Sequence, residues 1–267
     1  MSELPFSATT PTHVSKVGLK ARDANALATY YRHLLGLEEI ANRAGTIVLG
    51  AAGRELLEIE STPSAKPDDP RSAGLFHTAF LLPSRKELAR WVRYARENRI
   101  ALTGASDHLV SEAVYLNDPE GNGIEIYADR PRESWARNGG DIAMATERLD
   151  IDGLLRELDG DARAYNAAPE GTVIGHVHLR VGDPKVAEAW WHREMGFDTM
   201  AKYGAAAVFL ASGGYHHHIG ANAWQSAGAG RRDRDRAGLA FVELASRDHA
   251  PNTLTDPWGT EIRVVAG

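Results

Sequence analysis

The sequence predicts an α+β protein built from four tandem units, each holding a strand, a helix and about three further strands. The first observation is an internal repeat, because residues 14–39 and 174–199 match as strand, aspartate turn, helix and glycine stop. The second is a pair of similar turns, DPEGNG at 118–123 and DPWGT at 256–260, which are typical of hairpins. Two further copies of the unit contain these turns, each just before its last strand.

The first and third units are the most complete. Aromatic pairs at residues 30–31 and 190–191 take equivalent places in their predicted helices. Gly36 and Gly196 follow these helices, and glycine suits the left-handed conformation in which many helices end. Short strands are expected next: GTIVLG and RELLEIES in the first unit, AAAVFLA and YHHHIGAN in the third.

The second and fourth units follow the same plan less fully. The second has the strand FHTAFLLP, the helix RKELARWVRYARENR and the strands EAVYL and GIEIYAD, whereas the fourth is truncated in the middle. Residues 129–171 break the pattern through a shift in charge and glycine content, and they contain one predicted helix, IDGLLRELDG. The predicted division is therefore 1–128 for an N-terminal pair of units, 129–171 for a connector and 172–267 for a C-terminal pair.

Composition excludes several classes of function. A net charge of −6 gives no broad positive field for nucleic acid, and the run RRDRDR is interleaved with aspartates. No stretch approaches the roughly 18 apolar residues of a membrane span, and the N-terminus does not resemble a signal peptide, so we expect a cytoplasmic protein. With no cysteine in the chain, any metal must be held by His, Asp or Glu.

Several segments carry a resemblance to a known family. Four tandem units, with DPEGNGIEIY closing the second and GHVHL opening the third, resemble the vicinal oxygen chelate superfamily of glyoxalase I, fosfomycin-resistance proteins and type I extradiol dioxygenases. The segments LFHTAFLLPSR, ASDHLVSEAVYLNDPEGNGIEIYADRPR and GYHHHIGAN are similar to its catechol-2,3-dioxygenase-like branch. The resemblance implies two cupped mixed β-sheet halves with the helices outside, and metal ligands on the first and last strands of the units.

Those strand positions predict a metal site between the second and third units. Aligning the units places His77 and His176 on first strands and Glu125 on a last strand. Two histidines and one carboxylate leave three adjacent positions open on an octahedral Fe(II), which is the expected cofactor. Mn(II), Zn(II) and Ni(II) are the alternatives.

The first and fourth units do not offer such a set at the equivalent positions, which hold Lys16, Glu58, Leu239 and Arg263. Glu261 shares the strand face of Arg263, so a slipped register would move the site to the C-terminal half. That site would combine His176, a histidine of the third unit and Glu261.

The three consecutive histidines suggest acid/base chemistry. In a strand, His216 and His218 would face one way and His217 the other. Extradiol enzymes carry a proton-transferring histidine on the corresponding strand, so the resemblance implies that His218 or His216 is catalytic, with His218 as a fourth ligand as the alternative. His108, in a loop of the second unit, is expected to face the substrate. Further residues proposed around the substrate are Phe80, Tyr127, Phe209 and Trp224.

The predicted function is a metal-dependent extradiol dioxygenase that opens a catechol-like aromatic diol with O2. One alternative is a glyoxalase-type isomerase or lyase that uses Zn or Ni. Another is a non-catalytic protein that sequesters a drug in the cup. The expected partners are the aromatic diol and O2, without nucleic acid or membrane, and a homo-oligomer is left open.

Overall fold

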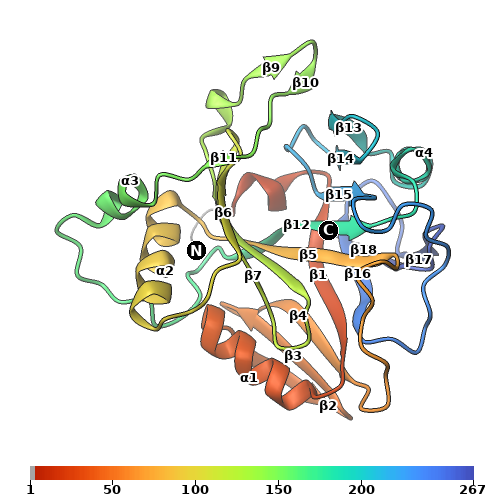
Figure 1. The fold of residues 1–267 in the computed structure, drawn as a ribbon, viewed down its shortest axis with the longest axis horizontal. Helices are drawn as coiled ribbons and strands as arrows, with labels where there is room; N and C mark the ends of the chain where they lie inside the picture. The colour runs from red at the N-terminus through yellow and green to blue at the C-terminus, as the bar shows by residue number, and fades with distance from the viewer. Residues whose placement is uncertain (1–3) are drawn as a thin grey trace.

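The computed structural model describes residues 4–267, and the first two units have the predicted order of elements (Figure 1). The first unit comprises η1 (Phe6–Thr9), β1 (Thr12–Ala21), α1 (Ala24–Leu35), β2 (Glu38–Arg43), β3 (Thr46–Ala51) and β4 (Arg54–Ser61). The second comprises β5 (Gly74–Leu81), α2 (Arg85–Glu97), β6 (Gly104–Asp107), β7 (Ser111–Asn117) and β8 (Gly123–Asp129).

The connector and the last two units follow. The connector holds η2 (Arg132–Ser134), β9 (Arg137–Asn138), β10 (Asp141–Ile142), β11 (Glu147–Arg148), α3 (Ile151–Leu155) and η3 (Arg156–Leu158). The third unit comprises β12 (Val173–Arg180), α4 (Pro184–Met195), β13 (Asp198–Tyr203), β14 (Ala207–Ala211) and β15 (Ile219–Asn222). The fourth comprises β16 (Gly238–Ser246), β17 (Asn252–Thr255) and β18 (Glu261–Ala266).

The repeat is visible in how α1 and α4 begin and end. Asp23 accepts a hydrogen bond from the first turn of α1, and Asp183 does the same for α4. Gly36 and Gly196 end the two helices with φ values of 64° and 60°, the left-handed conformation that glycine adopts at low cost. The match between residues 14–39 and 174–199 therefore extends to the helix caps.

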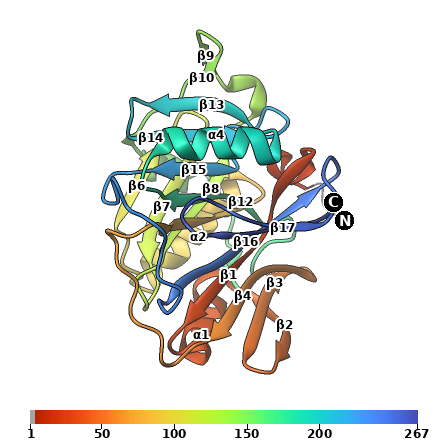
Figure 2. The same ribbon diagram turned by 90° about the vertical axis from the view of Figure 1, so that its right-hand side faces the viewer.

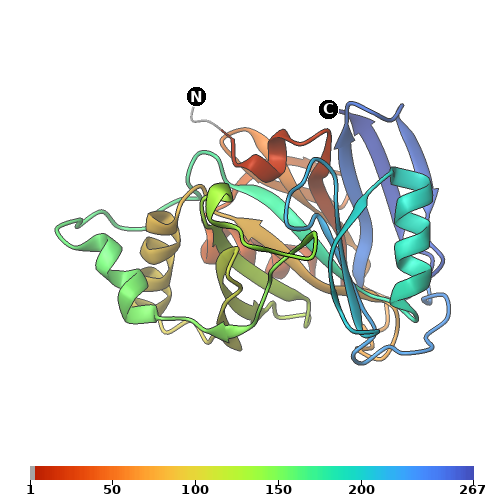
Figure 3. The ribbon, with the colours of Figure 1, turned by 90° about the horizontal axis from the view of Figure 1, so that it is seen from above.

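Most strands lie in two curled mixed sheets, and β9 and β10 form a separate two-stranded sheet. One has seven strands in the order β17-β18-β16-β1-β4-β3-β2, and the other has nine in the order β11-β6-β7-β8-β5-β12-β15-β14-β13. Helices α1, α2 and α4 lie on the outside, with α4 running across β14 and β15 in Figure 2 and α2 and α4 on opposite sides in Figure 3. The predicted α+β class with cupped mixed sheets and outer helices is confirmed.

The units pair differently from the predicted division of the chain. Antiparallel pairing of β1 with β16 joins the first and fourth units, and that of β5 with β12 joins the second and third. Each sheet thus combines strands from 1–128 and 172–267. The predicted pairing of the first unit with the second, and of the third with the fourth, is therefore wrong. The division into 1–128, 129–171 and 172–267 stays a prediction.

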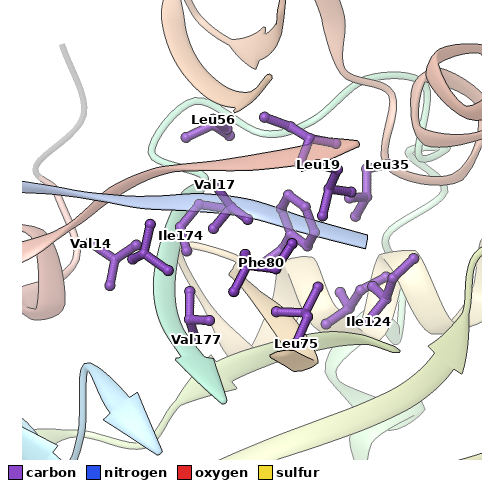
Figure 4. Close-up of a cluster of buried hydrophobic side chains, with 14 of the residues drawn as sticks. Val14, Val17, Leu19, Leu35, Leu56, Leu75, Phe80, Ile124, Ile174 and Val177 are labelled. Atoms are coloured by element: carbon purple, nitrogen blue, oxygen red, sulfur yellow. The ribbon is translucent and has the colours of Figure 1, made fainter. Parts of the chain in front are cut away.

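One continuous hydrophobic core joins the two sheets. Val14 and Val17 of β1 pack with Ile174 and Val177 of β12, and Phe80 of β5 lies in the same cluster (Figure 4). Burying such side chains removes apolar surface from water at roughly 25 cal/mol per Å². None of the helices in residues 4–267 has the length and apolar character needed to span a bilayer.

Candidate metal centre and active site

Three neighbouring strands of the nine-stranded sheet bring the predicted ligands together. β5 lies between β8 and β12, and Ala79 of β5 pairs with both Glu125 of β8 and His176 of β12. His77 precedes Ala79 by two residues and therefore points to the same face. Alternation along the strands thus places His77, Glu125 and His176 side by side in the cup.

The distances within this group suit a metal ion. One ligand atom from each of His77, Glu125 and His176 lies within 4.8 Å of the other two, the one such group found in residues 4–267. Glu125 Oε2 is 3.0 Å from His77 Nε2 and 3.2 Å from His176 Nε2. The first of these contacts lacks hydrogen-bonding geometry, so His77 Nε2 is buried without a hydrogen-bond partner within the described chain.

The charge states also suit ligation. Burial by itself would raise the pKa of Glu125, but His176 and His77 beside it bring the pKa well below its usual value. Burial lowers the pKa of His176 to about 4, although Glu125 acts in the opposite direction. At neutral pH the group is therefore a carboxylate beside a neutral imidazole, the forms that bind metals. The three side chains are at most 8% exposed, and burying an ionised carboxylate is costly unless a partner stabilises it.

A cavity of about 280 Å³ opens beside the group. Its lining includes five large aromatic side chains: Phe76, Tyr115, Tyr203, Phe209 and Trp224. Three of the aromatic residues that the sequence placed around the substrate can be compared with this lining. Phe209 and Trp224 line the cavity, whereas Phe80 is fully buried in the core. A small ligand could be held here between aromatic faces, next to the metal ligands.

His178 also lines the cavity, two residues after His176 on the same strand face. Its ring lies against the backbone of Gly220, where a Cβ would come within 2.7 Å of the ring. Nε2 of His178 is buried and has no hydrogen-bond partner among residues 4–267. His178 is not in the ligand group, so the strand contributes one ligand and one further cavity residue.

The structure corrects the expected orientation of the three histidines. Residues 212–218 form an irregular turn and bends, and β15 begins only at Ile219, so the alternation of a strand does not apply. His217 lines the cavity, with its ring centroid 4.1 Å from that of His176. His216 and His218 do not line it.

His218 has a different environment. Its Nε2 lies 3.1 Å from the Ser7 carbonyl oxygen and 3.2 Å from Thr10 Oγ1, and its Nδ1 accepts a hydrogen bond from the Ser212 amide. It joins the chain before β1 to the turn after β14. A role as catalytic residue or fourth ligand does not fit this position.

His108 faces the cavity as expected, and its partner Tyr115 was not predicted. His108 Nδ1 lies 2.6 Å from the Ala145 carbonyl and therefore donates to it, which leaves Nε2 to accept from the Tyr115 hydroxyl at 2.5 Å. Tyr115 pairs directly with Glu125 across β7 and β8, a register that the DPEGNG turn could have revealed. The sequence suggests Tyr127 as a residue around the substrate. Its hydroxyl instead forms a hydrogen bond with the buried Tyr215 hydroxyl, and it does not line the cavity.

The seven-stranded sheet has no ligands at the equivalent positions. Glu243 pairs with both Lys16 and Arg263, as Ala79 does with His176 and Glu125. Lys16 lies 2.9 Å from Glu55, and Arg263 stacks on Phe241, which occupies the place of His77. Two cations and a phenyl ring thus occupy the positions equivalent to the His–Glu–His group.

The slipped-register alternative does not fit this arrangement. Glu261 is ion-paired with Arg263 at 2.7 Å, on a strand of the seven-stranded sheet. His176 lies in the other sheet, so the structure does not bring these two predicted partners together.

The paired βαβββ units, with a His–Glu–His group inside the curved nine-stranded sheet, are typical of one superfamily. Residues 13–126 match the Glyoxalase/Bleomycin resistance protein/Dioxygenase superfamily, and the chain belongs to it. The chain is 43% identical over 237 residues to a catechol-2,3-dioxygenase of Bacillus subtilis strain 168, which covers 87% of this chain and 82% of that protein.

Solved structures share the fold at low identity. A Bacillus subtilis protein described as a candidate dioxygenase aligns with a TM-score of 0.63 at 13% identity, over 96% of this chain and 85% of its own. Glyoxalase I from Zea mays aligns with a TM-score of 0.58 at 13% identity, over 98% and 94%. At this identity the two structures support the architecture and not a particular reaction.

Proposed function

We propose that this protein is an extradiol dioxygenase that opens a catechol-like aromatic diol with O2 next to the hydroxyl groups. The observation that carries the proposal is the buried group of His77, Glu125 and His176 at a cavity with aromatic walls. The relative at 43% identity, named a catechol-2,3-dioxygenase, supports it.

The relative and the ligand group together imply a metal cofactor, and we propose that it is Fe(II). His77, Glu125 and His176 would hold it, because their donor atoms converge and His77 Nε2 is buried without a hydrogen-bond partner among the described residues. Bound Fe(II) would supply the redox chemistry that lets a diol react with O2, which two histidines and one carboxylate favour by leaving coordination positions open.

The remaining cavity residues have separate tasks in this proposal. Phe76, Phe209 and Trp224 would hold the aromatic ring and exclude water. A diol must lose hydroxyl protons to become a good electron donor, and His217 is placed beside His176 to accept one. His108 and Tyr115, which also line the cavity and are hydrogen-bonded to each other, would orient oxygen atoms of the substrate.

The test combines metal analysis with turnover. Protein purified anaerobically and loaded with Fe(II) is expected to consume O2 with catechol or a substituted catechol and to form a yellow ring-opened product. Zn(II)-loaded protein is the control and should be inactive with diols. Turnover of a hemithioacetal by the Zn(II) or Ni(II) form, without O2 uptake by the Fe(II) form, would contradict the proposal and favour an isomerase.

A further inference from the structure

A chain of hydrogen bonds leads from the cavity to the end of β8. His217 Nδ1 lies 2.8 Å from His216 Nδ1, and His216 Nε2 lies 2.9 Å from Asp129 Oδ1. The Tyr215 hydroxyl donates to the same oxygen at 3.2 Å. Both histidines are at most 8% exposed, whereas the Asp129 side chain keeps 17% of its surface in contact with solvent.

The local backbone explains why adjacent histidines can meet. Gly213 and Gly214 have φ values of 65° and 76°, so the chain turns sharply just before the histidines instead of continuing as a strand. The rings of His216 and His217 then lie with centroids 4.7 Å apart rather than on opposite faces. The Phe209 ring packs against the His217 ring, with the two ring centroids 5.0 Å apart.

The order of donors and acceptors follows from the carboxylate. An ionised carboxylate only accepts hydrogen bonds, so His216 must carry its proton on Nε2. If His216 carries only this proton, its Nδ1 accepts a hydrogen bond and His217 donates it from Nδ1. The only nitrogen of His217 left without a proton is then Nε2.

We propose that Asp129 and His216 are positioning residues that hold His217 as its Nδ1–H tautomer and so keep Nε2 ready to take a proton from a hydroxyl group of the substrate. The identity of that hydroxyl as a diol rests on the proposed function. The proton moves from the hydroxyl oxygen to Nε2, and the resulting imidazolium is stabilised through neutral His216 by the negative charge of Asp129. The same proton can return to the product oxygen, which restores neutral His217.

The tautomers can be read directly on the full-length chain. Two-bond ¹H–¹⁵N spectra of metal-free protein with ¹⁵N-labelled histidine, assigned with His216→Phe and His217→Phe, should show the proton on Nε2 of His216 and on Nδ1 of His217. In Asp129→Asn the amide is a weaker acceptor and can itself donate, so His217 should gain the Nε2–H form. A wild-type His217 protonated on Nε2 would overturn the assignment.

Kinetics provide the second arm. With Fe(II) bound, Asp129→Asn should lower kcat roughly 10- to 100-fold, leave KM within about twofold and keep the iron content unchanged. Tyr215→Phe is the matched control, because it removes the other hydrogen bond to the same Asp129 oxygen and should stay within about threefold of the wild-type kcat. Equal losses of kcat in Asp129→Asn and Tyr215→Phe would overturn the positioning role of Asp129. Loss of iron in His217→Phe would show that His217 binds the metal, and it would overturn the proposal too. If no diol is turned over, the proposed function fails while the spectra still decide the tautomers.

Discussion

His217 and His218 are neighbours in the chain with different chemical surroundings. Replacing His217 by Phe is expected to lower kcat with a diol by roughly two to four orders of magnitude, because the cavity loses its proton acceptor. His218→Phe removes hydrogen bonds to Ser7, Thr10 and Ser212 outside the cavity. It should therefore lower the free energy of unfolding and change kcat far less than His217→Phe does. Steady-state O2 uptake by the two variants decides, and a larger kcat loss in His218→Phe would contradict this placement.

His218 also predicts how stability depends on pH. Burial lowers its pKa to about 3, against about 6.5 in the unfolded chain, so the unfolded state binds the proton first as the pH falls. The stability contributed by neutral His218 is present above about pH 6.5 and is lost toward pH 3, at about 1.4 kcal/mol per pH unit. His218→Gln should be less stable at pH 7 and show a shallower decline between pH 6 and pH 4.5. Urea unfolding of metal-free protein measures both, and an unchanged slope would refute the prediction.

At the scale of strands, the metal centre depends on the register of β5, β8 and β12. Glu125→Ala should abolish metal binding and activity together, because it removes the carboxylate shared by the two ligand histidines. Glu261→Ala is the matched control on β18, where the side chain pairs with Arg263 instead. Metal content after Fe(II) loading and dialysis is the measurement. Iron lost in Glu261→Ala and kept in Glu125→Ala would return the site to the C-terminal half.

At the scale of the whole molecule, two sheets have equivalent strand positions, and one of them carries the candidate ligand group. We expect one metal ion per chain, since Lys16 and Arg263 place positive charge where the other sheet would need donors. Lys16→Ala should leave this stoichiometry at one, because Phe241 still occupies the place of a ligand histidine. Metal analysis of both proteins tests this, and two tightly bound ions in the wild type would contradict it.

The pairing of units across the chain makes a further prediction about folding. Residues 1–128 and 172–267, expressed separately, should each fail to unfold cooperatively, because β1 and β5 would lose their partners β16 and β12. Mixing the two should restore part of the native circular dichroism signal. A fragment that unfolds cooperatively by itself would show that the predicted division marks an autonomous domain.

The sequence by itself predicted the units, their helices and the convergence of His77, Glu125 and His176. Helix caps such as Asp23 and Gly36 and the turn at 118–123 act over a few residues, so their signals are local. Glu125 could be aligned with the two ligand histidines because a repeat preserves strand positions.

Only the tertiary structure decided which units pair and which histidine faces the cavity. Strand pairing between β5 and β12 joins residues about a hundred positions apart, and nothing local selects it over pairing by chain order. The orientation of His217 depends on two left-handed glycines and on Asp129, which approaches from another strand. These are contacts between the second and third units and a turn in the backbone, so the alternation rule of a strand could not reveal them.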